Sequence, residues 1–449
     1  MKSTFPVLLA LLAMRLPAQP VAPPALSLSN GPALSLSKGL TLDECLHIGA
    51  AQHPALAAAQ AGIAAATEAV GEAQAPLYPQ VDVSAGYHRW QRRAFLPSGL
   101  TLPGRPMPEI LGPLDDWNGA LSSRVLLYDS GERRAGVDAA KARRAGAAAE
   151  ATAVVADVRL NVQAAFYALA AASEVQTVAA KNLERAEAHQ RLAETRHAAG
   201  AVPKADVLRM QAEAANTRLQ LISAASRVRV ATGRLNTAMG RPAETPLVIN
   251  APTQTLPPPA VTDFGLVVQR ALAQRPELTS GEKRAEAARA AVTAARASRA
   301  PKIRADGAFG WRDTVLLPDT REWQAGVSIE LPLFDAGSRA RRLSRSMSEL
   351  TREEAVLAGR RLQIRDEVWA AYAEIDRTWA SIAASETSVR ANEESLRVTH
   401  ERYERGATVI TDLLDTQTSL ARAEGSLAEA RWSYLAARAA LDRAIGGEP

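Results

Sequence analysis

Two short stretches of the sequence place carboxylates just after a glycine that can end a helix. One contains Asp412 and Asp415, three residues apart, behind Gly406, and the other contains Asp206 behind Gly200. Both follow the pattern GxxxxxDxL, which predicts a tight turn between two helices. Carboxylates at such turns can cap the start of the second helix or present negative charge to cations.

Residue types that support catalysis are present but scattered. The single cysteine, Cys45, excludes an intramolecular disulfide and is expected to be buried. His189 and His197 share a predicted helix and are expected to be solvated rather than to bind a metal. No HExxH motif, phosphate loop, dinucleotide fingerprint or nucleophile elbow occurs, and no tight ligand cluster forms from the six histidines His47, His53, His88, His189, His197 and His400. The sequence therefore predicts no enzyme, no cofactor and no metal site.

The composition favours closely packed helices. Aromatic residues make up 4% of the 449 residues, while alanine and arginine are abundant. The formal net charge of +5 would permit nucleic-acid binding, but the arginines stand beside glutamates along predicted helices. We interpret these charges as solvated helix faces and expect no nucleic acid partner.

The two glycine turns belong to a long internal duplication. An offset of 206 residues superimposes them and holds far outside them, for it also matches Trp323 with Trp117, Asp335 with Asp129, Gly337 with Gly131, Val368 with Val162, Gln417 with Gln211 and Gly446 with Gly240. The chain is therefore two copies of one unit, residues 41–241 and 262–449, joined by a proline-rich linker over 242–261.

The residues before the first copy look like processing and spacer segments. Residues 1–22 resemble a secretory signal peptide, with Lys2 followed by an apolar run. Residues 23–40 contain a tandem octapeptide with no counterpart in the second copy, and we expect them to be disordered. Cys45 lies well beyond the apolar run, so it does not look like a lipid-anchor cysteine.

Each copy is expected to hold a helix, a β-hairpin and two long helices. The first helices should end near Ala75 and Arg299. The hairpins have apolar residues on one face and polar residues on the other, with the polar face containing Asp82, Ser84, Arg124, Arg304, Asp306, Ser328 and Glu330. The following run free of proline would form a helix of about 100 Å, with an apolar seam of Leu362, Val368, Ile375, Trp379, Ile382, Val389 and Leu396. Return helices should end at Gly240 and Gly446.

Strands with one apolar and one polar face suit a membrane β-barrel, in which all backbone groups are paired between strands. Four strands cannot close, eight from two chains would leave a filled interior, and twelve from three chains would leave a polar lumen. The alternative is a soluble four-stranded sheet with helical extensions. That alternative explains neither the signal peptide nor the length of the helices.

Residues 41–449 resemble the TolC family of outer-membrane channels. The resemblance lies in the duplicated plan, the Tyr78-Pro79 and Ala300-Pro301 strand entries, the Phe334-Asp335-Ala336-Gly337 exit and the two GxxxxxDxL turns. It implies a mainly α protein with a transmembrane β part, in which three chains form a twelve-stranded barrel in outer-membrane lipid and a twelve-helix periplasmic tunnel. It also implies a mid-height girdle built from the N-terminal, linker and C-terminal segments, and a periplasmic adaptor with an inner-membrane RND-type or ABC transporter as partners.

The same resemblance gives roles to the turn residues. A gate at the tunnel mouth would be formed by Tyr403, Asp412, Asp415 and Asp206, and adaptor-docking tips by Gly200, Ala201, Val202, Gly406, Ala407 and Thr408. Thr408 stands where the family often has an arginine that locks neighbouring turns, so a lock is expected to be weaker or built differently. The alternative role of Asp412 is an N-cap, because Asp206 repeats it, whereas the twin of Asp415 is Arg209.

Three functions are compatible with this sequence. The first is an exit duct for drugs, metals or other small solutes in a tripartite efflux system. The second is the exit duct of a type I protein secretion system, which the same architecture would serve. The third is a periplasm-spanning scaffold that conducts nothing. Polar residues on the inner strand face disfavour the scaffold but do not separate the first two functions.

Overall fold

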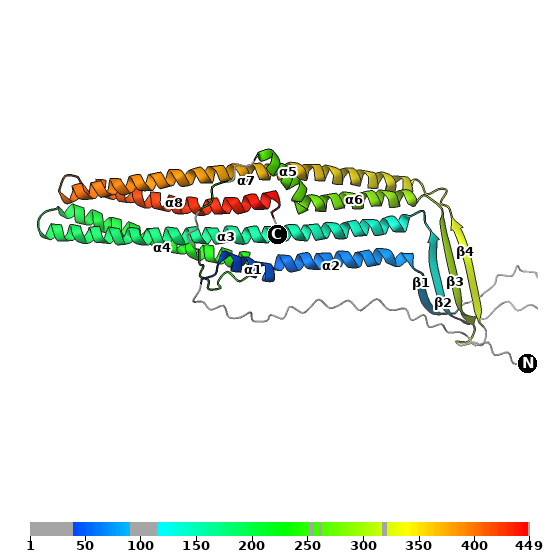
Figure 1. Ribbon diagram of the computed structural model, residues 1–449. Coiled ribbons are helices and arrows are strands. Elements are labelled where there is room, and N and C mark those ends of the chain that lie inside the picture. Colours follow the sequence, from blue (N-terminus) through cyan, green and yellow to red (C-terminus); the bar gives the residue numbers. More distant parts are fainter. Residues whose placement is uncertain (1–38, 90–114, 252–255, 260–262, 317–320, 448–449) are drawn as a thin grey trace, which may run out of the picture.

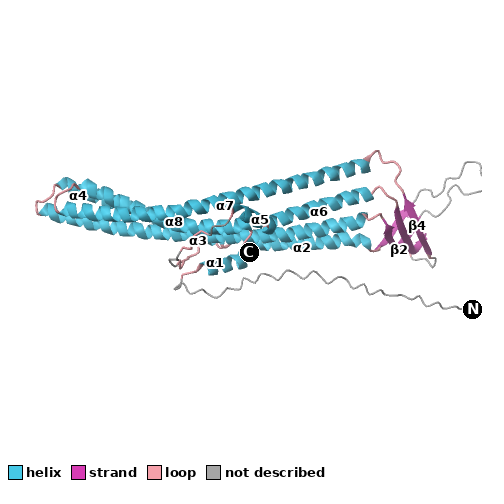
Figure 2. Cartoon of the chain, turned by 45° about the horizontal axis from the view of Figure 1, so that its top comes forward, coloured by secondary structure: helices cyan, strands magenta, loops and turns pink. Residues whose placement is uncertain are grey.

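A computed structural model describes residues 39–89, 115–251, 256–259, 263–316 and 321–447. The signal-peptide prediction, most of the low-complexity segment and the expected long loop after the first strand lie outside these residues. The molecule is a long bundle of helices with a small sheet at one end (Figures 1 and 2). The pairs of long helices meet at turns at the opposite end, which we call the tips.

The two halves of the chain contain the same elements in the same order. The first half holds α1 (Leu42–Gln52), α2 (Pro54–Gln74), a short 3-10 helix η1 (Ala75–Leu77), β1 (Gln80–Arg89), β2 (Asp115–Tyr128), α3 (Glu132–Ala198) and α4 (Lys204–Ala238). The second half holds α5 (Phe264–Gln274), α6 (Pro276–Ala297), β3 (Lys302–Asp313), β4 (Glu322–Glu330), α7 (Ser338–Glu404) and α8 (Ile410–Ile445).

The helix expected before each hairpin is in fact two helices. Pro54 and Pro276 each occupy the first position of the second helix, where their missing N–H group costs nothing. The residues before them, His53 and Arg275, have extended backbone angles, as a residue preceding proline prefers. A single continuous helix was therefore the wrong prediction for these two segments.

Matching turns lead from the sheet into the two longest helices. The carboxylate of Asp129 accepts hydrogen bonds from the backbone N–H groups of Gly131 and Arg133, and Asp335 does the same for Gly337 and Arg339. Gly131 and Gly337 have φ of 90° and 81°, which glycine adopts without strain. These bonds lower the pKa of the half-buried Asp335 carboxyl, and in Asp129 they outweigh the opposing effect of burial.

The long helices have the predicted length. α3 and α7 each contain 67 residues, which corresponds to about 100 Å. Val368, Ile375 and Ile382 of the predicted seam are buried. Leu362 is 67% exposed, so its assignment to the seam was wrong. Ile364 is buried instead, because a helix turns by about 100° per residue and Leu362 therefore points to the other side.

The four strands form one antiparallel sheet in the order β1-β2-β3-β4. The two hairpins join through β2 and β3, and a register irregularity occurs between Leu126 and Tyr128. Both β1 and β4 have one unpaired edge within the described residues. An exposed edge presents unsatisfied backbone groups that favour pairing with another strand.

Apolar clusters lie along the bundle at mid-length and at the tips. Cys45 is fully buried in a mid-length cluster with Val162 and Phe166, as expected, and burial raises the pKa of its thiol to about 11. Leu40, expected to end a disordered segment, is instead buried and pairs with Ile249 of the linker. The N-terminal, linker and C-terminal segments thus meet at mid-length (Figure 1).

One helix among the described residues, α3, is long and apolar enough in part to span a membrane by length and composition. Its alanine-rich sequence accounts for this property. The helix packs against α2, α4, α6 and α8 along its length. We therefore assign it to the helical bundle.

Candidate gate at the tips and the two faces of the sheet

The two tips are built alike. Gly200 and Gly406 have φ of 74° and 71°. Each is followed by an alanine whose N–H group reaches back to close the helix end, from Ala201 to the carbonyl of Arg196 and from Ala407 to that of Arg402, both at 2.8 Å. This is the Schellman arrangement that the glycine patterns predict. The predicted docking residues at these turns are exposed except for Val202 and Thr408, which are half-buried.

A cluster of apolar side chains holds the two tips together. Its buried members are Ala193, Val207, Met210, Tyr403, Ile410 and Leu413. Because these residues come from α3, α4, α7 and α8, the cluster joins both helical hairpins of the chain. Of the four predicted gate residues, Tyr403 belongs to this cluster, whereas Asp206 lies on α4 and Asp412 and Asp415 lie on α8.

Tyr403 is buried rather than open to solvent. Its side chain is 5% exposed, and its hydroxyl has no hydrogen-bond partner among the residues that the structure describes. Burial raises the pKa of Tyr403, and the nearby carboxylate of Asp206 raises it further. The structure therefore places Asp206 near Tyr403.

Arg196 is a tip residue that sequence reasoning missed. Its guanidinium lies 5.4 Å from the centre of the Tyr403 ring and donates to the carbonyls of Tyr403 and Glu404 at 3.4 Å. It therefore connects α3 to the end of α7. One signal pointed to it, because the offset of 206 pairs Arg196 with Arg402. Arg196 thus adds a contact between the two hairpins at the tips.

Asp412 and Asp415 are both exposed on α8. The N-cap of this helix is Val409, so Asp412 lies in its first turn and the N-cap alternative is wrong. Its carboxylate accepts a hydrogen bond from the Thr408 hydroxyl, which bridges the turn. Asp415 makes no hydrogen bond or ion pair with the described part of the chain. Both carboxylates are thus available to solvent at the tip.

Two histidines form a pair between the hairpins. The rings of His189 on α3 and His400 on α7 are 5.3 Å apart, so His189 is half-buried rather than solvated. His400 Nδ1 is buried without a partner in the described chain, and its Nε2 lies 3.5 Å from Glu404. No group of three histidine, cysteine, aspartate or glutamate residues suited to a metal occurs within the described ranges.

Acidification is expected to loosen this contact. Burial lowers the pKa of His189, and His400 and Arg185 lower it further, so the folded tip favours the neutral ring. Its contribution to stability is complete above the ordinary histidine pKa of about 6.5 and is lost as the pH falls below it. Hydrogen exchange of the tip amides should speed up between pH 7.5 and 5.5, after correction for intrinsic rates.

The matched variants decide whether the histidine pair causes this change. A His189→Gln, His400→Gln double variant should remove the pH dependence, and His197→Gln should keep it because His197 is exposed and its ring contacts the carbonyl of Val202 rather than the histidine pair. Other charges nearby are already paired, Arg185 with Glu424 of α8 and Glu187 with Arg218 of α4. An unaltered pH response in the double variant would assign it to other groups.

The register of the sheet separates the predicted polar and apolar faces. Directly opposite residues share a face, and Gln80, Arg124, Asp306 and Gly326 follow one another across the four strands. The seven polar residues predicted to share a face do so. The opposite face carries Val83, Leu121, Phe309 and Trp323 in one row, which are 82%, 49%, 51% and 77% exposed.

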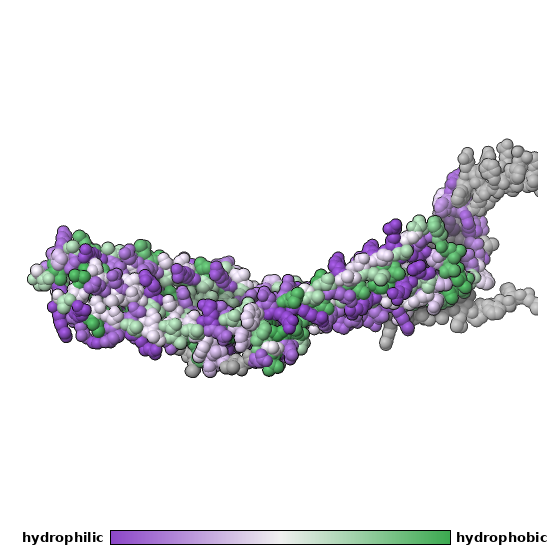
Figure 3. Space-filling view, turned by 90° about the horizontal axis from the view of Figure 1, so that it is seen from above, coloured by the Kyte–Doolittle hydropathy of each residue, from purple (hydrophilic) through white to green (hydrophobic). Residues whose placement is uncertain are grey.

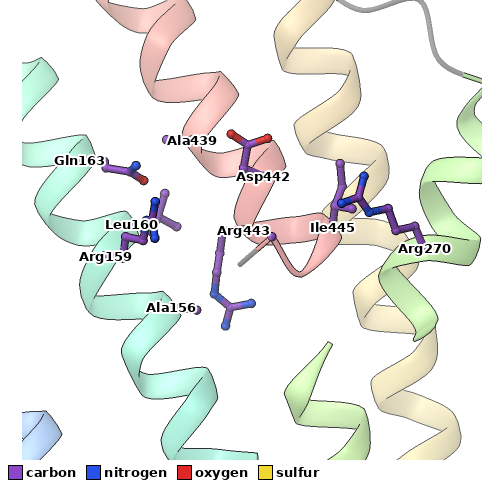
Figure 4. Close-up of a pocket in the computed structure, with 10 residues that line it drawn as sticks. Ala156, Arg159, Leu160, Gln163, Arg270, Ala439, Asp442, Arg443 and Ile445 are labelled. Atoms are coloured by element: carbon purple, nitrogen blue, oxygen red, sulfur yellow. The ribbon is translucent and has the colours of Figure 1, made fainter. Parts of the chain in front are cut away.

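A cavity of about 250 Å³ lies at mid-length between α3, α5 and α8 (Figure 4). Arg443 beside it forms ion pairs with Asp157 and Glu277, and the buried Arg275 binds Glu277 and Glu367. Burial alone would raise the pKa of Glu277, but these two arginines lower it. The network ties the end of α8 to α3 and α6, so we assign it a structural role.

A sheet with two exposed faces, joined to paired helices of about 100 Å, is the architecture expected of a subunit of an elongated channel. The sequence profile described as outer membrane efflux protein matches residues 47–241 and 267–447. The chain belongs to this family, whose members are outer-membrane channels extending into the periplasm and not enzymes. The predicted resemblance, fold class and location are thereby confirmed.

Two relatives match over most of the chain. Protein CyaE of Bordetella pertussis is 32% identical over 88% of this chain and 82% of its own length. The pyoverdine export outer membrane protein OpmQ of Pseudomonas aeruginosa is 27% identical over 87% and 82%. Among solved structures, VceC of Vibrio cholerae has a TM-score of 0.78 at 21% identity, covering 90% of this chain and 96% of its own. The outer-membrane channel OprN has a TM-score of 0.79 at 22% identity, covering 91% of each chain.

Proposed function

We propose that three copies of this chain form an outer-membrane exit duct for small solutes, supplied by a periplasmic adaptor and an inner-membrane RND-type pump. The observation that carries the proposal is the two-faced sheet with two unpaired edges. Pairing β4 of one chain with β1 of the next closes twelve antiparallel strands around a polar lumen. The predicted polar residues from Asp82 to Glu330 would line that lumen.

The helices support closure with the same neighbours. α2, which precedes the edge strand β1, buries none of its residues within the single chain. On α7, which follows the β4 edge, Met347, Val356 and Leu362 are more than half exposed. A neighbouring copy would cover both surfaces when β4 pairs with β1. Apolar surface of this kind on two opposite edges suits a closed ring of subunits.

Small solutes are favoured over proteins as cargo by one relative. OpmQ is described as a protein of pyoverdine export, and it matches 87% of this chain. The exposed turns around Gly200 and Gly406 are the proposed docking points for the adaptor. Type I protein secretion, with an ABC transporter in place of the RND-type pump, is the second candidate.

The native mass of the detergent-solubilised protein tests the assembly. We expect the mass of three chains and ion conductance in planar bilayers, because an isolated sheet would expose unpaired backbone to lipid. Bilayer insertion by a monomer would contradict the closed barrel. A trimer that never conducts would support the scaffold.

The cargo is tested in cells that lack the gene. Export of a siderophore-sized fluorescent solute and the proteins of the culture medium should be compared with those of the parent strain. Loss of solute export with unchanged secreted proteins is expected. Loss of one secreted protein with unchanged solute export would favour type I secretion instead.

A further inference from the structure

The helix ends next to the sheet carry a concentration of positive charge. Residues 63–79, 129–144, 288–302 and 335–349, which adjoin the four strands, contain thirteen basic and seven acidic side chains. Their net charge of +6 exceeds the +5 of the whole chain, so the remaining residues together are slightly negative. We call these four segments the basic collar. A trimer would carry three of them at one height.

Exposed aromatic side chains mark the boundary between the sheet and the collar. Tyr78, Tyr128 and Phe334 are 67%, 53% and 90% exposed, and Leu333 beside them is 88% exposed. Hydrophobic side chains gather at this junction in the space-filling view (Figure 3). Aromatic residues at such positions lie at the level of the lipid headgroups. The collar therefore begins where the membrane should end.

The contacts of Glu132 show which side of the collar faces away from the lumen. Lys302 lies on the polar face of the sheet, opposite Glu330, and binds Glu132 at the start of α3. Successive residues of a helix are rotated by about 100°, so Arg134 and Lys141 point to the side of α3 opposite Glu132. This side of α3 continues the apolar, lipid-facing surface of the sheet. Asp138 is the one exposed acidic residue between Arg134 and Lys141.

On α6, Arg296 lies on the same outer side. Arg284 binds Glu150, which is five helical turns beyond Glu132 and so on the inner side of α3. Arg289 and Arg296 are seven residues apart on a different exposed side of α6, where Arg289 binds Glu354 of α7. No ion pair within the described chain involves Arg134, Lys141 or Arg296. All three side chains are exposed.

We propose that Arg134, Lys141 and Arg296 bind the phosphate groups of anionic phospholipids in the leaflet facing the helices. Arg134 and Arg296 each lie six residues from the end of the adjoining strand, and Lys141 lies about two helical turns further along α3 than Arg134. The headgroup layer is roughly 5–8 Å deep on each side of the bilayer core. Arginine and lysine stems can extend toward it. This inference rests on the proposed barrel and adds a lipid partner to it.

Native mass spectrometry of the trimer from nanodiscs tests the proposal. Nanodiscs of phosphatidylethanolamine with phosphatidylglycerol should yield trimers that retain phosphatidylglycerol, preferentially and in a salt-sensitive manner. Each charge near the surface changes lipid affinity roughly fivefold. The triple variant Arg134→Gln, Lys141→Gln, Arg296→Gln should therefore weaken retention about 100-fold.

The control removes three exposed charges from the inner side of the collar. Arg143 lies three turns from Glu132, while Arg342 and Arg345 lie about one and two turns from Ser338, the twin of Glu132. Arg143→Gln, Arg342→Gln, Arg345→Gln should retain the lipid. Equal losses in both triple variants, or no preference for phosphatidylglycerol, would overturn the proposal. The same spectra give the mass of the assembly. A missing trimer would count against the proposed function and not against the lipid site alone.

Discussion

Arginine in place of Leu121 should abolish most membrane assembly, whereas arginine one residue later, at Ser122, should be tolerated. Leu121 lies at the middle of β2 on the apolar face, between Val83 and Phe309. Arginine on the lipid side costs about 2–4 kcal/mol near the bilayer midplane. At Ser122 the new charge would lie on the polar face opposite Asp82, in water and beside an opposite charge.

A second pair of variants repeats the comparison on an edge strand. Val327→Arg places the charge on the apolar face of β4, where Val327 is 67% exposed. Gln324→Arg places it on the polar face opposite Ala308, and is a better control than Ser328→Arg because Ser328 lies opposite Arg304. Trimer in the outer-membrane fraction, resistant to added protease, is the quantity to measure. Equal assembly defects on both faces would show that the sheet is oriented differently.

The regular features of the fold could be predicted because they depend on local patterns. Alternation of polar and apolar residues fixed the faces of every strand before any pairing was known. The offset of 206 residues predicted two copies with the same helix lengths. Pro54 and Pro276 occupy matching positions in the two copies, 222 residues apart. Each of these prolines predicts a break in the helix, because the residue before a proline avoids helical backbone angles.

The contacts between the two copies could not be predicted in the same way. The His189–His400 and Arg196–Tyr403 pairs join helices more than 200 residues apart in the chain. His189, His400 and Tyr403 have different residues at the matching positions, and the match of Arg196 with Arg402 does not identify Tyr403 as its contact. A period of three and four residues identifies an apolar helix face but not its partner. Leu362 was assigned to the wrong face, because its spacing of six from Val368 turns the helix by about 600° and leaves Leu362 about 120° away from Val368.

The tip carboxylates are expected to act as a cation gate. Asp412 and Asp415 are exposed on the first turns of α8, so a three-fold axis near the tip would bring six carboxylates together. The trimer should then conduct little, favour cations, and be blocked from the tip side by multivalent cations such as hexaamminecobalt(III). Closely spaced carboxylates attract such ions strongly.

Removing the carboxylates should open the path without unfolding the tip. Asp415→Ala should relieve the block and lower the cation preference, because its twin Arg209 shows that the turn forms without a carboxylate there. Asp412→Ala should do the same and cost about 0.3–1 kcal/mol of helix stability, since Asp412 interacts with the helix N-terminus from the first turn rather than as its cap. Asp376→Ala, an exposed carboxylate of α7 far from the tip, should leave block and selectivity unchanged. If the Asp412→Ala, Asp415→Ala double variant still blocked like the parent, the constriction would lie elsewhere, with the buried Tyr403 and Arg196 contact as the next place to test.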